Sequence, residues 1–208
     1  MEEPSLIARH GAIWVLNKPS GWLTHPSGDP EVPSLQAWAR DNLSSTLSPA
    51  HRLDRETSGL ILWAEDPQVR AEIGRWLAEG QISKTYQALV YGRTHKKGII
   101  RRPLADARRG RKLEAVTRYR AIANPTGRLT LIMARPETGR KHQIRRHLQG
   151  IGHPIVGDDR YPPKRRKSVP NFPGRLWLHA LRLQLPDNTL FEAPLPVLLE
   201  QHLGSITQ

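Results

Sequence analysis

The chain has 208 residues, 38% of them hydrophobic, which is enough apolar material for the core of one sizeable globular domain. It contains no cysteine, which excludes disulfide bonds, cysteine nucleophiles and thiolate zinc sites. Lysine and arginine number 32 against 19 acidic residues, so the formal net charge is +13. This excess favours a polyanionic partner such as a nucleic acid over a merely solubilising surface.

The sequence offers no segment that predicts insertion into a membrane. Its longest apolar runs, 60–64 and 195–199, are far shorter than the roughly 20 residues of a membrane-spanning helix. The N-terminal residues begin acidic and lack the basic start and the small-residue cleavage site of a signal peptide. Together with the absence of cysteine, these features predict a cytoplasmic protein.

Hydrophobic spacing and turn residues predict a mixture of strands and helices. In chain order, we expect a strand at 12–16, a helix at 34–43, a strand at 58–64, a helix at 67–79 and a strand at 85–91. Two hairpin strands at 115–122 and 129–134, a helix at 140–151, a strand at 177–185 and a helix at 196–203 follow. We therefore predict an α+β fold, with a mixed and mostly antiparallel sheet flanked by helices and loops, in a single domain over residues 1–208.

The positive charge is concentrated in two segments. Between Arg93 and Lys112 lie nine basic residues and one acidic residue, Asp106. The run Lys164 to Lys167 follows two prolines. Glycine and proline surround both segments, so we expect exposed loops rather than the amphipathic helix of a lipid-binding surface. We interpret both as contacts for the phosphates of RNA.

The segment HRLDRETSGLILWA places a carboxylate, Asp54, in a polar turn just before an apolar strand. A strand end holds a side chain more rigidly than a free loop does. The neighbouring Arg52 and Arg55 favour the charged form of the carboxyl group. An ionised and fixed carboxylate can act as a nucleophile. Taken alone, however, an aspartate in a turn is more often a capping residue, and Asp54 and Thr57 would then simply cap the turn before the strand.

The segment HRLDRETSGLIL resembles the nucleophile motif of the RluA-type pseudouridine synthases. Further segments resemble other motifs of that family in the same order, from about residue 15 to residue 186: LNKPSGWLTHP, SKTYQALVYG, PETGRKHQIRRHLQGIGHPIVGDDRY and LWLHALRLQLP. The resemblance covers nearly the whole chain. It implies the pseudouridine synthase fold, with the active site in a central cleft, and an isomerase that converts uridine to pseudouridine in RNA.

The resemblance also implies a set of site residues. By position, the catalytic aspartate corresponds to Asp54, the active-site tyrosine to Tyr86 and the active-site arginine to Arg145, which would pair with Asp54. The arginine that displaces the flipped base corresponds to Arg52, and an apolar wall residue beside that base corresponds to Leu178. Tyr86 would stack on the uracil and take the proton from its C5 atom.

We expect no cofactor and no metal, because the isomerisation involves no redox change and no energy input. His142, His147 and His153 are close in sequence, but the first two are five residues apart and point to different sides of a helix. No Gly-Lys-Ser/Thr phosphate loop is present either. The expected partner is structured RNA, bound by a monomer.

The sequence defines the target RNA less clearly than it defines the reaction. The first motif begins near Ala12, so we expect no N-terminal RNA-binding domain of the S4 type. Lys141 within GRKHQIRRHL, together with KPSGW, resembles the subgroup that modifies uridine 65 of tRNA. We therefore favour tRNA, with ribosomal RNA as the alternative. A catalytically silent RNA-binding module and a base-excising glycosylase are competing functions, which assays for pseudouridine and for free uracil would separate.

Overall fold

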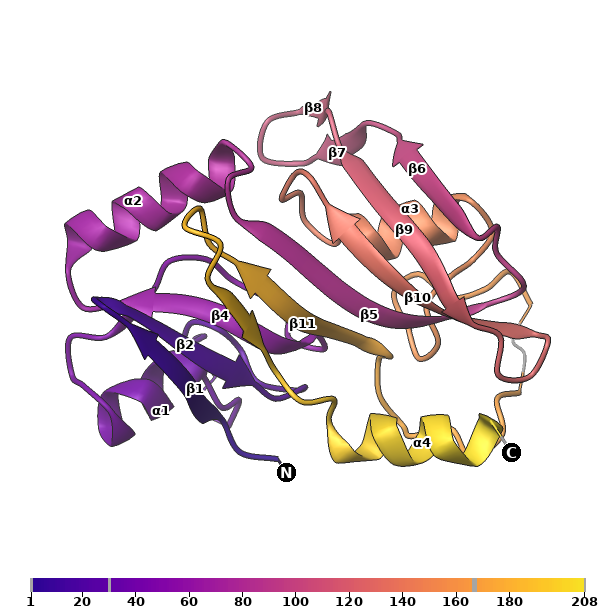
Figure 1. The fold of residues 1–208 in the computed structure, drawn as a ribbon, viewed down its shortest axis with the longest axis horizontal. Helices are drawn as coiled ribbons and strands as arrows, with labels where there is room; N and C mark the ends of the chain where they lie inside the picture. Colours follow the sequence, from indigo (N-terminus) through magenta and orange to yellow (C-terminus); the bar gives the residue numbers. More distant parts are fainter. Residues whose placement is uncertain (1, 30, 166–167, 208) are drawn as a thin grey trace. The chain divides into compact units, whose positions relative to one another are not determined.

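The computed structural model describes residues 2–29, 31–165 and 168–207. The chain forms two compact units (Figure 1). The first unit comprises Met1–Ile82 and Ala180–Pro194, and the second comprises Ser83–His179 and Leu195–Gln208. Within the described residues, no helix has the length and apolarity that a membrane span needs.

The first unit is built on β-strands. Its strands are β1 (Ser5–His10), β2 (Ile13–Lys18), the short β3 (Ser48–Pro49), β4 (Ser58–Ala64), the C-terminal part of β11 (Leu178–Gln184) and β12 (Leu190–Glu192). They include the antiparallel pairs β1–β2, β2–β4, β3–β4 and β11–β12. Strand β4 lies between β2 and β11, and all seven of its residues are buried. A strand with neighbours on both sides and covered faces explains the continuous apolar run of this segment.

Two helices complete the first unit, and both begin at side-chain caps. Helix α1 (Leu35–Asn42) starts after Ser34, whose hydroxyl accepts the N–H of Ala37 at 3.1 Å. Helix α2 (Pro67–Ala78) starts after Asp66, whose carboxylate accepts the N–H of Gln68 at 2.6 Å. Ile73 of α2 is fully buried in the same hydrophobic cluster as β4.

The second unit contains a four-stranded antiparallel arrangement in the order β5-β10-β9-β6. The strands are β5 (Ser83–Tyr91), β6 (Lys97–Arg101), β9 (Val116–Ala123) and β10 (Leu129–Pro136). A small hairpin of β7 (Leu104–Asp106) and β8 (Arg111–Leu113) precedes β9. Helix α3 (Gln143–Gly150) lies beside β9 and β10, and α4 (Val197–Thr207) adds Leu199 and Ile206 to the hydrophobic cluster of this unit (Figure 1).

The prediction that the basic segment 93–112 is a loop was wrong. It contains β6 and the β7–β8 hairpin. Among the described residues, strand β6 pairs only with β9, so it is an edge strand. An edge strand can carry charged residues on its exposed positions. These charges obscured the strand pattern. In the second basic cluster, Lys164 and Arg165 are exposed, whereas Arg166 and Lys167 lie outside the described residues.

Gly59, the glycine of the HRLDRETSG segment, allows a close approach within the first unit. Its φ angle is +116°, and a Cβ atom there would lie 2.3 Å from the carbonyl oxygen of Ala180 in β11. Only glycine combines that backbone conformation with that contact. The glycine after the Asp54 turn is therefore required by strand packing.

We predict that Gly59→Ala lowers the free energy of unfolding by about 3 kcal/mol or more, because it adds backbone strain and an overpacked contact. Gly74→Ala is the matched control, since Gly74 lies inside α2 and a Cβ there would meet nothing within 4 Å. The control should gain about 0.5–1 kcal/mol. Urea unfolding followed by circular dichroism measures both, and equal stability of the two variants would contradict the prediction.

Candidate active site

A buried lysine organises the backbone around Asp54. Lys18 lies at the end of β2 with no exposed surface. Its ammonium group donates to the carbonyl oxygens of Pro19 and Trp22, each at 2.8 Å, and of Arg55 at 3.0 Å. Three carbonyl acceptors match the three protons of an ammonium group. Lys18 thus connects the Lys-Pro-Ser-Gly turn to the residue immediately after Asp54.

Backbone bonds strengthen this connection between the two segments. The N–H of Gly21 donates to the carbonyl of Arg55 at 2.9 Å, and the Nε of Arg55 donates to the carbonyl of Gly21 at 3.0 Å. The hydroxyl of Ser20 donates to the carbonyl of Glu56 at 2.7 Å. The guanidinium of Arg55, which the sequence places beside Asp54, is therefore part of the contact between the turns.

Hydrogen bonds also hold Leu53, which precedes Asp54, and Thr57, which follows it. The hydroxyl of Thr24 accepts the N–H of Leu53 and donates to its carbonyl, both at 3.2 Å. The N–H of Thr57 donates to the carbonyl of Asp54 itself at 3.1 Å. Leu53 and Thr57 are buried, while Asp54 between them is half-buried. The turn therefore presents the carboxylate from a backbone that is fixed on both sides.

Two other residues of the motif have different environments. The Nε2 of His51 accepts the N–H of Leu62 in β4 at 3.0 Å, so this histidine secures the start of the loop to the sheet. Arg52 has an exposed side chain. An exposed arginine beside a fixed carboxylate is suited to contact RNA, whereas His51 has a structural contact that the sequence did not reveal.

Tyr86 belongs to the second unit and lies in β5 opposite Ala134 of β10. Its half-buried ring packs against the hydrophobic cluster that contains Ile144 of α3 and Leu178, the first residue of β11. The structure therefore brings Tyr86 and Leu178 to one cluster. Lys84, two residues before Tyr86, is largely enclosed, and burial lowers the pKa of its ammonium group.

Arg145 of α3 forms a buried ion pair that the sequence analysis did not anticipate. Its Nε lies 2.8 Å from one carboxylate oxygen of Asp158, and its Nη2 lies 2.9 Å from the other. Arg145 is 2% exposed and Asp158 is 4% exposed. Asp158 also accepts the N–H groups of Arg160 and Tyr161. Its pairing with Asp54, which the resemblance implies, stays a prediction.

The bidentate geometry fixes the plane of the Arg145 guanidinium. The ring of Tyr161 lies 5.5 Å from the guanidinium carbon, and the hydroxyl of Tyr161 lies 3.0 Å from Nδ1 of His142. The Asp158 contact uses Nε and Nη2, so the third nitrogen, Nη1, is not part of that ion pair. The Gly-Asp segment near residue 158 therefore serves to orient the arginine of the His-Gln-Ile-Arg segment.

Gln143 explains why the Thr-Gly-Arg and His-Gln-Ile-Arg segments occur together. Its side-chain oxygen accepts from the hydroxyl of Thr138 at 2.6 Å and from the N–H of Arg140 at 3.1 Å. Its side-chain nitrogen donates to the carbonyl of Val116 and to the hydroxyl of Thr117 in β9. This buried amide joins the turn, the start of α3 and the sheet.

The three histidines considered as metal ligands have separate partners. His142 contacts Tyr161, His147 lies between the hydroxyl of Thr117 and the carbonyl of Arg102, and His153 contacts the carbonyl of Tyr91. Burial lowers the pKa of His147. Each ring is therefore engaged in a local hydrogen bond that supports the second unit.

Comparisons with known proteins find similarity over most of this chain. Residues 12–150 match the family described as RNA pseudouridylate synthase. The chain is 33% identical to tRNA pseudouridine synthase C of Haemophilus ducreyi, over 96% of this chain and 92% of the relative. It is 37% identical to the enzyme of that name from Pectobacterium carotovorum, over 82% of this chain, and this match spans only about half of the relative, 52%.

A solved structure shows the same fold. The structure titled human RNA pseudouridylate synthase domain containing 4 superposes with a TM-score of 0.80 and 24% sequence identity, over 97% of this chain and 92% of the human chain. The predicted α+β fold with a mostly antiparallel sheet is therefore confirmed.

We predict that Asp158→Ala lowers the free energy of unfolding by about 3–5 kcal/mol, because it leaves the buried guanidinium of Arg145 without its carboxylate. Asp159→Ala is the control, since the neighbouring Asp159 is exposed. We expect the control to change stability by less than about 0.5 kcal/mol. Chemical unfolding at neutral pH measures both values. Similar stabilities for the two variants would show that the ion pair does not support the fold.

Proposed function

Because this chain belongs to the RNA pseudouridylate synthase family, we propose that it isomerises a specific uridine to pseudouridine, with uridine 65 of tRNA as the target. The observation that carries the proposal is the support of Asp54. Buried Lys18 and the Gly21–Arg55 hydrogen bonds hold the backbone beside a carboxylate that is itself half-buried. The formal net charge of +13 suits an RNA substrate.

The reaction breaks the bond between C1′ of the ribose and N1 of the uracil, and forms a bond between C1′ and C5. The proton lost from C5 is balanced by the proton gained at N1, so no oxidant, reductant or leaving group is consumed. In this proposal Asp54 is the nucleophile. Attack on the sugar, attack on the base and a glycal route are all consistent with a carboxylate in this position, and none of them requires a cofactor or a metal.

The enzyme must first expose the target uridine, which costs a few kcal/mol of lost stacking and pairing. We assign Arg52 to this step, because its exposed guanidinium can stack or form hydrogen bonds where the base was. Tyr86 then stacks on the uracil, and its hydroxyl accepts the C5 proton. Leu178, which shares a hydrophobic cluster with Tyr86, forms the apolar wall beside the base.

Arg145 is the proposed partner of the Asp54 carboxylate. The bidentate contact with Asp158 supports this role, because it orients the guanidinium and leaves Nη1 outside that contact. Asp54 belongs to the first unit and Arg145 to the second. We therefore propose that both units act as one catalytic domain over residues 1–208, and that the protein is a cytoplasmic monomer.

One experiment tests the proposed target and reaction together. Purified protein is incubated with unmodified tRNA and, separately, with unmodified ribosomal RNA, and pseudouridine is then mapped in both. We expect modification of tRNA at position 65. Modification of ribosomal RNA alone would show that ribosomal RNA, not tRNA, is the target. Release of free uracil would indicate a glycosylase. RNA binding without formation of pseudouridine would indicate a catalytically silent RNA-binding module.

We predict that Asp54→Asn lowers turnover by more than about 10³-fold, the order of loss expected when a nucleophile is removed. The amide fills the same space but cannot attack the substrate, so RNA affinity and thermal stability should stay close to wild type. Asp41→Asn, at an exposed position of α1, is the matched control and should retain full turnover. Turnover of Asp54→Asn within about tenfold of wild type would exclude Asp54 as nucleophile.

Two substitutions of Tyr86 separate the roles of its ring and its hydroxyl. With RNA that carries 5-fluorouridine at the target, we predict that Tyr86→Phe keeps most of the affinity. Tyr86→Leu should lose about 1–3 kcal/mol of binding free energy, the range for one base–aromatic stack. With normal RNA, both variants should form almost no pseudouridine, because the base that removes the C5 proton is missing. Wild-type turnover by Tyr86→Phe would show that another group takes this proton.

A further inference from the structure

The sheet of the second unit has an exposed face that carries arginine and lysine side chains. We define this outer sheet face by its exposed residues on three neighbouring strands: Lys97, Ile99 and Arg101 of β6, Arg118 and Arg120 of β9, and Arg135 of β10. Tyr119, which alternates with these positions on β9, is buried in the hydrophobic cluster on the opposite side. Tyr86 pairs with Ala134, the residue opposite Tyr119, so it also points to that opposite side.

The strand register places like charges directly opposite each other on the outer sheet face. Lys97 of β6 is paired with Arg120 of β9, and Arg118 of β9 is paired with Arg135 of β10. Like charges at directly opposed positions of an antiparallel pair destabilise the sheet. Each such pair is therefore a cost to the fold unless other groups of the protein compensate its charges. Residues that break a local rule without a structural gain point to a function.

The Lys97–Arg120 pair is the one that the protein does not neutralise. Arg118 has an ion pair with Glu137, and Arg135 donates to the hydroxyl of Ser83 at 2.6 Å. In contrast, no hydrogen bond or ion pair of the Lys97 or Arg120 side chain occurs among the residues that the structure describes. This pair presents two exposed positive charges for an external anion.

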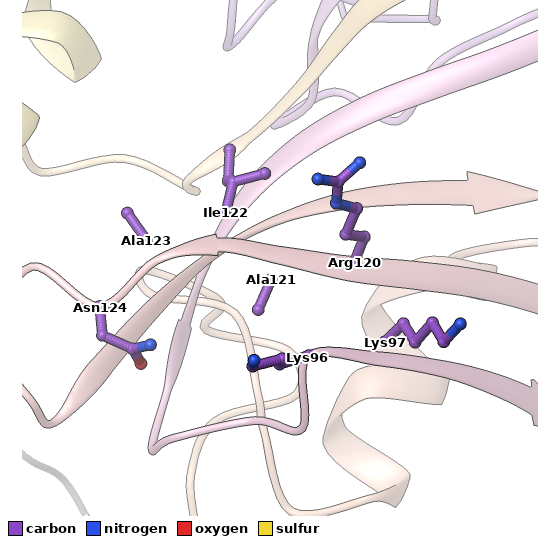
Figure 2. A pocket seen from close by; sticks show the side chains of 7 residues that line it. All are labelled: Lys96, Lys97, Arg120, Ala121, Ile122, Ala123 and Asn124. Atoms are coloured by element: carbon purple, nitrogen blue, oxygen red, sulfur yellow. The ribbon is translucent and has the colours of Figure 1, made fainter.

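A shallow depression of about 390 Å³ adjoins this pair. Figure 2 shows its lining, in which the cationic residues are Lys96, Lys97 and Arg120 and the remaining residues are Ala121, Ile122, Ala123 and Asn124. The side-chain oxygen of Asn124 accepts from the hydroxyl of Thr130 at 2.9 Å. No acidic residue is part of this lining. The three cations beside this depression are groups that can contact phosphate oxygens.

The arrangement fits a polymer of phosphates better than a single small anion. The depression is open, and further cations, Arg118 and Arg101, continue from it along β9 and β6. Alternate residues on a strand repeat at about 6.8 Å, so the charges form a row. A lipid surface is not favoured, because the face is a sheet and lacks the amphipathic helix of an interfacial anchor.

Contacts around the edge strand connect this face to the helix of Arg145. After β6, the carbonyl of Arg102 contacts Nε2 of His147 in α3 at 2.9 Å. Within β7, the carbonyl of Ala105 accepts from Nη1 of Arg146, also in α3, at 3.1 Å. The connection from β6 to α3 thus includes the exposed residue Arg102, which follows Arg101 of the outer sheet face.

We propose that the outer sheet face is a second RNA-binding surface, which holds the phosphate backbone of a substrate stem away from the target uridine. The proposal rests on the proposed function, because the RNA bound there is the RNA that is modified. The stem follows the edge of β6 from the α3 side to the outer sheet face. Its contacts are to phosphates, so the surface increases affinity for a folded RNA without reading its sequence.

The test compares two double variants that remove the same charge. The probe is the unmodified tRNA transcript, and its dissociation constant is measured at several salt concentrations. For Lys97→Gln with Arg120→Gln, we expect about tenfold weaker binding near 0.15 M salt. The slope of log affinity against log salt should also fall by about 1.8, or 0.9 for each lost phosphate contact. Arg40→Gln with Arg75→Gln, at exposed positions of the first unit, is the control. Its changes in affinity and in salt slope should each be at most about a third of those of the Lys97/Arg120 double variant.

A second measurement distinguishes loss of contacts from damage to the fold. Removing the opposed charges should leave the melting temperature of the Lys97/Arg120 double variant equal to or above that of wild type. Equal RNA affinities and equal salt slopes for the two double variants would overturn the proposal. Pseudouridine formation by the wild-type protein on the same transcript is scored separately. Its absence would count against the proposed function, while the binding comparison would still decide whether this face holds RNA.

Discussion

The buried ammonium group of Lys18 is the constraint on which the candidate active site depends. A lysine without exposed surface is costly unless its charge is compensated, and here three carbonyl oxygens surround it. One of them belongs to Arg55, so the compensation is available only when the loop of Asp54 is folded against the Lys-Pro-Ser-Gly turn. The cost of burying the charge thus enforces the position of the loop. An arginine could not replace Lys18, because a planar guanidinium does not direct its protons to three converging carbonyls.

In the second unit, Arg145 is likewise a buried cation whose charge is compensated by oxygen atoms. A buried ion pair contributes little net stability compared with apolar residues of the same size, but removing one partner is strongly destabilising. Its value here is orientation, because the two-point contact with Asp158 allows one placement of the guanidinium. Gln143 then fixes the start of the helix from which Arg145 extends. In both units, therefore, a buried cation and its oxygen partners set the geometry of a residue that we assign to catalysis.

The charge of the surface follows a different rule from the charge of the interior. Buried Lys18 and Arg145 each have several oxygen partners, whereas Lys97 and Arg120 face each other across two strands. Water screens exposed charges, so an opposed pair is tolerable at an edge strand, although it still lowers stability. A net charge of +13 means that many such charges cannot be paired within the chain. The RNA substrate of the proposed reaction would supply the missing counter-charge.

The sequence by itself determined those features that depend on neighbouring residues. The apolar run at 58–64 is strand β4, the helix expected at 67–79 is α2 at Pro67–Ala78, and the hairpin strands expected at 115–122 and 129–134 are the antiparallel pair β9 and β10. The local sequence pattern did not predict some element boundaries and edge strands. The helix expected from residue 140 begins only at Gln143, because that side chain caps the preceding turn and His142 adopts a left-handed conformation. Strand β1 and the edge strand β6 were not expected, since their exposed polar residues hide the alternation. The contact of Lys18 with Arg55 and the contact of Arg145 with Asp158 were decided by tertiary structure alone. Those contacts join residues 37 and 13 positions apart, and a buried charge selects its partner by three-dimensional proximity rather than by spacing along the chain.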